Sequence, residues 1–71
     1  MTSEIISQRI NTLLARDNIQ QKQLAEFLEM HPATLNGYMT GRRDFPVHVI
    51  LNIANYFTVS TDYILGRTDE A

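Results

Sequence analysis

The side chains best suited to recognising another molecule lie between residues 21 and 43. The amide of Asn36 can form two hydrogen bonds with the edge of an adenine base, and the adjacent cations Arg42 and Arg43 can each bind a phosphate. His31 and His48 lack the cysteine or carboxylate spacing that a metal site or a general base needs. The chain also lacks a nucleophile triad, a glycine-rich phosphate loop and paired acids placed for hydrolysis. We therefore expect a binding protein rather than an enzyme, with no metal and no cofactor.

The pattern of residues 21–41 predicts two short helices joined by a tight turn. The apolar residues of the first helix recur at three- and four-residue steps and so share one stripe; they are Leu24, Ala25, Phe27 and Leu28. Pro32 marks the start of the second helix, because proline fits the first helical position, where its missing N–H would be unpaired anyway. Gly41 suits a left-handed residue that ends this helix. Helices joined by so short a turn must cross steeply, which projects the second one outward.

The helix that begins at Pro32 has two different faces. Its apolar positions are Leu35, Tyr38 and Met39, and we expect them to face the core. The expected water-facing positions are Ala33, Asn36, Gly37 and Thr40.

Helical spacing also predicts three further helices, so the expected fold class is all-α. Ser3 is the expected cap of the first helix, Pro46 opens the fourth, Ser60 caps a short fifth helix and Gly66 ends it. The expected inward residues of the first helix are Ile6, Ile10, Leu13 and Leu14, and those of the fourth are Val47, Ile50, Leu51, Ala54 and Phe57.

Length and composition favour one domain over residues 1–71. A hydrophobic fraction of 44% with 20% charged residues is typical of a soluble globular protein, and 71 residues suffice for one core only. The absence of cysteine excludes disulfides and thiolate metal sites, so packing must hold the fold. No long apolar run or basic, apolar leader is present, which makes the cytoplasm the expected location, with no membrane partner and no evident small-molecule ligand.

Charge is distributed unevenly along the chain. The net charge of −2 argues against nucleic acid if taken alone. However, the chain up to Arg43 has five basic and four acidic residues, whereas the chain from Asp44 onward has one basic and four acidic residues. Local cations near phosphate matter more than the whole-chain sum.

The order and spacing of residues from Glu4 to Gly66 resemble the Cro/CI-type (XRE-type) helix-turn-helix regulators of phages and bacteria. The residues that carry this resemblance are Arg9-Ile10, Leu13, Gln21, Leu24-Ala25, Thr34-Leu35, Tyr38, Gly41-Arg42, Pro46, Ile53-Ala54, Val59-Ser60 and Asp62 to Gly66. The resemblance implies a compact five-helix bundle of the lambda-repressor-like type, with a helix-turn-helix at about residues 21–40 and its third helix in the major groove of double-stranded DNA.

From this resemblance and the residue chemistry together, ten residues are predicted to contact DNA: Gln21, Lys22, His31, Pro32, Ala33, Thr34, Asn36, Gly37, Arg42 and Arg43. Among them, Arg42 and Arg43 are expected to anchor phosphates and Asn36 to read a base. His31 is expected to lie in the turn or at the N-cap.

Three departures from the family pattern bear on these expectations. Glu29 stands where the family usually has glycine, so it must adopt the turn conformation at a steric cost or shift the helix boundary. Met39 replaces a glutamate that often pairs with the first-helix arginine, so Arg9 needs another acceptor or reaches phosphate. Pro32, Ala33 and Gly37 are too short to form bidentate hydrogen bonds with bases, so DNA shape is expected to carry part of the specificity.

Two classes of function follow. The favoured one is a sequence-specific regulator, expected to act as a repressor, that binds its operator as a homodimer. The expected dimer interface includes Tyr56, Tyr63 and Ile64, because this region has more apolar side chains than a short helix needs. The alternative is an all-helical protein-interaction module, such as the partner-binding part of an antitoxin, with little affinity for DNA.

Overall fold

The computed structural model describes residues 2–71, except for the side chain of Thr2. Within this range it contains five α-helices and no β-strand, which confirms the predicted all-α class. The helices are α1 (Thr2–Asp17), α2 (Gln21–Phe27), α3 (Pro32–Met39), α4 (Val47–Phe57) and α5 (Thr61–Ile64). None of them is long and apolar enough to cross a membrane.

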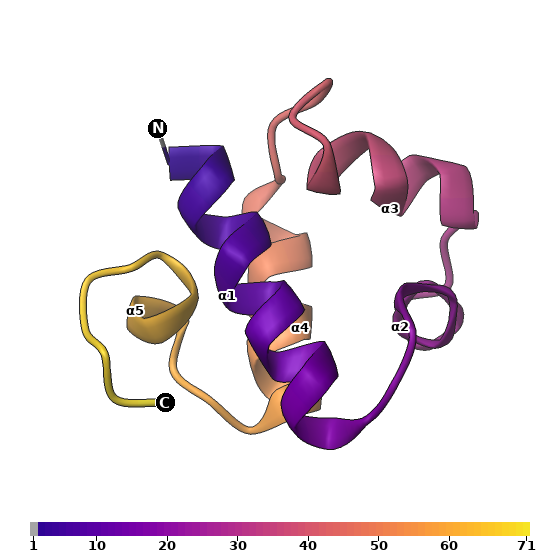
Figure 1. The fold of residues 1–71 in the computed structure, drawn as a ribbon. Coiled ribbons are helices and arrows are strands. Elements are labelled where there is room, and N and C mark those ends of the chain that lie inside the picture. Colours follow the sequence, from indigo (N-terminus) through magenta and orange to yellow (C-terminus); the bar gives the residue numbers. More distant parts are fainter. Residues whose placement is uncertain (1) are drawn as a thin grey trace.

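The arrangement of the helices places α3 at one end of the molecule. α1 contacts both α3 and α5, which lie on opposite sides of it, while α4 contacts α5 (Figure 1). α2 contacts α3 and is seen nearly end-on while α3 lies across the view, so the two axes cross steeply as predicted (Figure 1). The molecule measures 29 × 25 × 19 Å.

Each helix is followed, within two positions, by a residue in the left-handed region of backbone space. These residues are Asn18, Glu29, Gly41, Thr58 and Gly66. At the end of α2, for example, the Met30 N–H donates to the Ala25 carbonyl at 3.1 Å, which closes the helix and reverses the chain. Glu29 has a φ of 56°, so the first of the two expected outcomes holds: it adopts the turn conformation without a glycine.

The core is formed by apolar side chains from every helix. The predicted inward stripe of α1 is confirmed, because Ile6, Ile10, Leu13 and Leu14 are all buried. Ser3, however, lies inside α1 and does not cap it, since the helix already includes Thr2.

The inward face of α4 differs from the prediction. Val47 is 74% exposed and Leu51 is 49% exposed, whereas Val49 and Ile53 are buried. The reason is the rotational register of the helix: its buried residues are Val49, Ile50, Ile53, Ala54 and Phe57, a stripe shifted around the helix from the predicted one. Apolar residues occupy most of the first half of α4, so spacing alone does not fix which of them face inward.

The short helix α5 is buried more completely than predicted. The Ser60 hydroxyl accepts a hydrogen bond from the Tyr63 N–H at 3.0 Å, which confirms the predicted cap. Ile64 is fully buried and Tyr63 is 7% exposed, so these two of the three predicted interface residues offer almost no surface to a second chain. The cause is that α1 and α4 both contact α5, and the Arg9 guanidinium lies 4.5 Å from the centre of the Tyr63 ring.

Candidate nucleic-acid interface

The turn between α2 and α3 holds the start of α3 in a fixed direction. His31 is the N-cap of α3, and its Nδ1 accepts a hydrogen bond from the Ala33 N–H at 3.0 Å, which confirms the predicted N-cap role. Pro32 occupies the first helical position, as predicted. Leu35 is fully buried and anchors the inner face of α3 to the core. The other face of α3 is therefore directed outward with little freedom to rotate.

Two contacts made by other parts of the chain hold the C-terminal half of α3. The Ser7 hydroxyl on α1 donates a hydrogen bond to the Met39 carbonyl at 2.8 Å. The ring of Tyr38 packs against Phe45, with centroids 5.5 Å apart. Ser7 did not stand out in the sequence, because a single serine on an amphipathic helix carries no signal that it will meet a residue 32 positions later.

One hydrogen bond links the predicted contact residues of α2 and α3. The Gln21 Nε2 donates to the Asn36 Oδ1 at 3.4 Å. Gln21 is half-buried and Asn36 is exposed, so this long hydrogen bond brings the two amides together at the surface where α2 meets α3. Lys22 is exposed on the first turn of α2.

The outer face of α3 carries short side chains. Pro32, Ala33, Asn36 and Thr40 are exposed, and Thr34 is half-buried. Gly37 is buried, in contrast to the expectation that it faces water. The side chains of Arg42 and Arg43 cover it: Arg43 Cδ lies 3.9 Å and Arg42 Nη2 4.0 Å from the position that a Cβ of residue 37 would occupy. The two arginines that follow α3 thus fold back over it.

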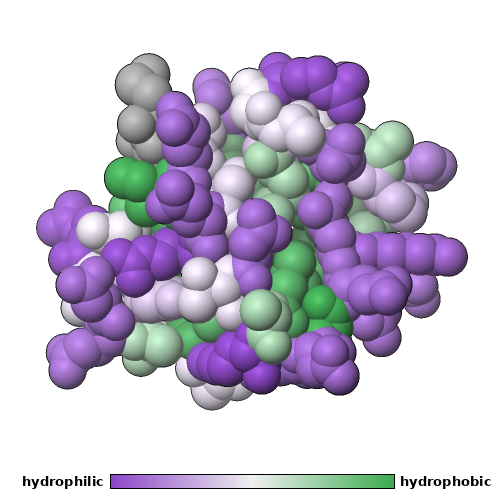
Figure 2. Space-filling model, viewed as in Figure 1, coloured by the Kyte–Doolittle hydropathy of each residue, from purple (hydrophilic) through white to green (hydrophobic). Residues whose placement is uncertain are grey.

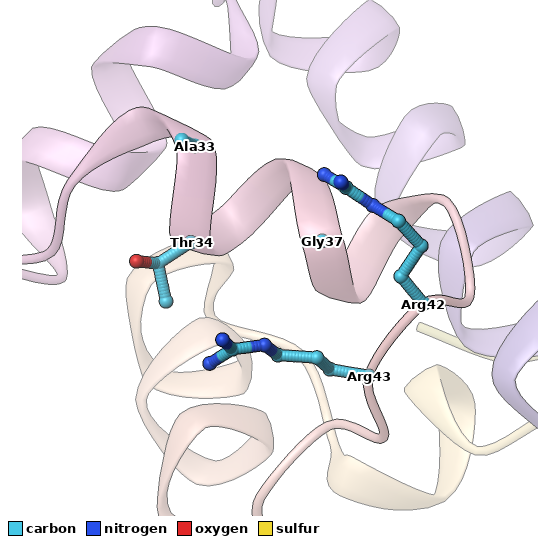
Figure 3. A pocket seen from close by; sticks show the side chains of 5 residues that line it. All are labelled: Ala33, Thr34, Gly37, Arg42 and Arg43. Carbon is cyan, nitrogen blue, oxygen red and sulfur yellow. The ribbon is translucent and has the colours of Figure 1, made fainter.

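A cavity of about 310 Å³ lies on the outer face of α3. Its lining consists of Ala33, Thr34, Gly37, Arg42 and Arg43, all of which were predicted to contact DNA (Figure 3). The two guanidiniums lie on either side of Gly37, and that of Arg43 lies toward Thr34 (Figure 3). Figure 2 shows strongly hydrophilic side chains over the loop that follows α3.

The basic side chains divide into two groups by their partners. Arg9 pairs with Asp69 at 2.9 Å, Arg16 with Asp17 at 2.7 Å, and Arg67 with Asp62 at 3.5 Å. The Asp69 carboxylate raises the pKa of Arg9, and this pair supplies the acceptor that the replacement by Met39 left open.

Within residues 2–71, Lys22, Arg42 and Arg43 form no salt bridge. All three belong to the helix-turn-helix or to the loop that follows it. The cations without an acidic partner in this part of the chain are therefore concentrated beside α3.

Comparison with known proteins finds relatives of this chain among transcriptional regulators. Two curated proteins of Bacillus subtilis (strain 168) are similar: the uncharacterized HTH-type transcriptional regulator YobD is 32% identical over 89% of this chain and 56% of its own length. The HTH-type transcriptional regulator ImmR is 30% identical over 90% of this chain and 50% of its own length. The chain thus spans about half the length of these relatives. Both are described as regulators, in agreement with the expectation that this chain is not an enzyme.

A solved structure has the same fold. The crystal structure of a transcriptional regulator from Listeria innocua superposes with a TM-score of 0.77 over 93% of this chain and 62% of its own, at 24% sequence identity. The profile of the family described as Helix-turn-helix, HTH_3, matches residues 10–64, which include α2, α3, α4 and α5 entirely. The chain therefore belongs to this helix-turn-helix family, to which the XRE-type regulators belong.

Proposed function

We propose that this chain binds double-stranded operator DNA as a transcriptional repressor, with α3 in the major groove. The observation that carries the proposal is the sorting of the cations: those paired with acids lie elsewhere, while Lys22, Arg42 and Arg43 lie beside α3 without an acidic partner in residues 2–71. A paired cation must give up its acid before it binds a phosphate, whereas an unpaired cation can bind directly and displace counterions condensed on the DNA.

Phosphate binding and base reading fall to different residues in this proposal. Lys22 at the start of α2 and Arg42 after α3 lie at the two ends of the helix-turn-helix, where they can hold phosphates on either side of the groove. Asn36 reads a base, with Gln21 orienting its amide. The short outer residues Pro32 and Ala33 let α3 approach the base edges closely, and DNA shape supplies further specificity.

We further propose that the operator-bound form is a homodimer. One α3 with few long polar side chains reads too few base pairs to select a site in a genome, and a twofold pair doubles that information. Since Tyr63 and Ile64 are buried, we assign the pairing to α4, where two apolar side chains, Val47 and Leu51, are exposed one turn apart. Tyr56 is half-buried beside Phe27 and is a less favourable contact.

Selection of bound sequences from a random DNA pool, followed by footprinting on the enriched site, tests the proposal. We expect inverted half-sites whose centres lie about 34 Å apart, one helical turn of DNA. Sedimentation with and without this site reports whether two chains bind together. Protection of a single asymmetric half-site by a monomer would exclude the homodimer, and failure to enrich any sequence would exclude sequence-specific binding.

A second function is favoured by one observation. Phe27 is 51% exposed although its ring packs against Tyr56 with centroids 4.4 Å apart, which leaves an aromatic surface between α2 and α4. Such a surface suits a protein partner, as in an antitoxin-type module. A gel-shift assay at low salt separates the two functions, because a pure protein-interaction module would not retard DNA at micromolar concentration.

A further inference from the structure

We propose that Arg43 reads a guanine, in place of the side chains that α3 itself lacks. This inference rests on the proposed function, since it assumes that the outer face of α3 enters the major groove. It assigns to Arg43 a role in specificity that differs from the phosphate anchoring expected from its position in the sequence.

The first step of the argument is the path of the Arg43 side chain. Its Cγ and Cδ lie 4.0 and 3.9 Å from the position that a Gly37 Cβ would occupy, so its aliphatic part crosses α3 there. The Arg42 atom nearest to the same position is its terminal Nη2, at 4.0 Å. The Arg43 guanidinium therefore extends further along α3 than that of Arg42, toward Thr34 (Figure 3).

The second step is the position of that guanidinium relative to a bound duplex. Ala33 and Gly37 are one helical turn apart and lie on the same face of α3, and both line the cavity that Arg43 enters. If α3 lies in the major groove, the middle of this face meets base edges, whereas phosphates line the rims of the groove. A guanidinium there meets guanine N7 and O6, with which arginine forms its commonest specific contact.

The third step is preorganisation. The Arg43 N–H donates to the Gly37 carbonyl at 3.1 Å, which fixes the start of the side chain to the end of α3. Within residues 2–71 its guanidinium forms no salt bridge, so no acid has to be displaced when DNA binds. Position 37 leaves this path open because its side chain is small: a Cβ there would lie at an ordinary contact distance of 3.9 Å from Arg43 Cδ, whereas a long side chain would occupy the path of Arg43.

The experiment compares the DNA preferences of matched variants by selection from a random pool. Arg43→Ala should lose the preference for guanine at one position of each half-site and keep the rest of the profile. Arg43→Lys should retain a weaker preference, because lysine keeps the charge and can donate to guanine but lacks the rigid fork of the guanidinium. Arg42→Ala should weaken binding and leave the profile unchanged. Gly37→Leu should lose the same guanine preference as Arg43→Ala, since it displaces Arg43 and cannot hydrogen-bond a base itself.

Replacement of that guanine by 7-deazaguanine provides a test at the level of one atom. It removes the N7 acceptor, so the wild-type chain should bind about tenfold more weakly while Arg43→Ala should not respond to the replacement. An unchanged guanine preference in Arg43→Ala, or equal losses by the wild type and Arg43→Ala on 7-deazaguanine, would overturn the reading role and leave DNA binding intact. A wild-type chain that enriches no sequence would overturn the proposed function itself.

Discussion

Glu29 is a strained residue in the turn between α2 and α3. It holds a left-handed conformation, with a φ of 56°, that costs an L-residue about 1–2 kcal/mol and costs glycine almost nothing. This conformation is what allows the chain to reverse between α2 and α3. The turn is therefore built at the expense of stability.

Replacement of this residue gives a prediction for stability. Glu29→Gly should raise the free energy of unfolding by up to about 1 kcal/mol, since relief of the strain outweighs the greater entropy of glycine in the unfolded chain. The matched control is Glu26→Gly inside α2, which should lower it by roughly 0.5–1 kcal/mol. Urea unfolding measures both, and a loss of stability in Glu29→Gly would show that the backbone is not strained there.

Asn36 is the residue on which base reading by α3 itself depends. Asn36→Ala should cost about 1–3 kcal/mol of binding free energy on the preferred site, because both hydrogen bonds to adenine are lost. Preference at one base pair per half-site should relax while non-specific binding persists. Quantitative binding to the selected site and its single-base variants measures this. An unchanged preference profile would transfer the reading role to other residues.

At the scale of elements, the helices were predictable and the orientation of their faces was less so. Caps and stops such as Pro32, Ser60 and Gly66 act locally, so their consequences could be derived from the sequence. Which residues of α4 face inward, and whether Tyr63 is buried, depend on the helices that pack against them. These contacts join distant parts of the chain, so local sequence patterns do not predict them.

The register of α4 can be tested by two apolar truncations on the same helix. Ile53→Ala should lower the free energy of unfolding by about 2–5 kcal/mol, because Ile53 is fully buried and leaves a cavity. Leu51→Ala should cost less than about 1 kcal/mol, because Leu51 is 49% exposed. Chemical denaturation of both variants decides between the two registers, since the predicted inward stripe would reverse this order.

The ends of α1 and α4 are joined by Arg16. Its guanidinium bonds the Asp17 carboxylate and also donates to the Phe57 carbonyl at 3.1 Å. The hydrogen bond from Arg16 lowers the pKa of Asp17. Because the pKa of Asp17 is lower in the folded chain than in the unfolded chain, ionised Asp17 stabilises the fold at pH values above its unfolded pKa. This stabilisation is lost as the pH falls through the folded-state pKa.

This linkage gives a pH prediction. Asp17→Asn should be less stable than the wild type at neutral pH, and the difference should vanish in acid, where the wild-type carboxylate is protonated as well. Thermal unfolding from neutral to acidic pH measures the difference. In an Arg16→Met background Asp17→Asn should have no effect; a persistent pH-dependent difference there would assign the shift to another partner.

At the scale of the whole molecule, a chain with a net charge of −2 is proposed to bind a polyanion. Repulsion between the net negative charge and DNA is offset locally, because the basic residues without an acidic partner in residues 2–71 are gathered in one region. Three arginines form surface ion pairs with nearby aspartates away from α3, and the remaining cations, Lys22, Arg42 and Arg43, belong to the helix-turn-helix and the loop that follows it. The resemblance to Cro/CI-type helix-turn-helix regulators could be seen in the sequence, and so could the excess of acidic residues from Asp44 onward. The folding of Arg42 and Arg43 back over Gly37 could not, because it depends on a loop packing against a helix that precedes it.

The salt dependence of DNA binding tests this sorting of charges most directly. Affinity for one duplex is measured by fluorescence anisotropy over a series of salt concentrations for the wild type, Arg42→Ala and Arg67→Ala. Arg42→Ala should bind more weakly and reduce the slope of log affinity against log salt by about one unit, the amount expected for one lost phosphate contact. Arg67→Ala should retain the wild-type affinity and slope, because Arg67 is paired with Asp62 and lies beyond α5. A reduced slope in Arg67→Ala with none in Arg42→Ala would contradict the placement of the DNA-binding surface on α3.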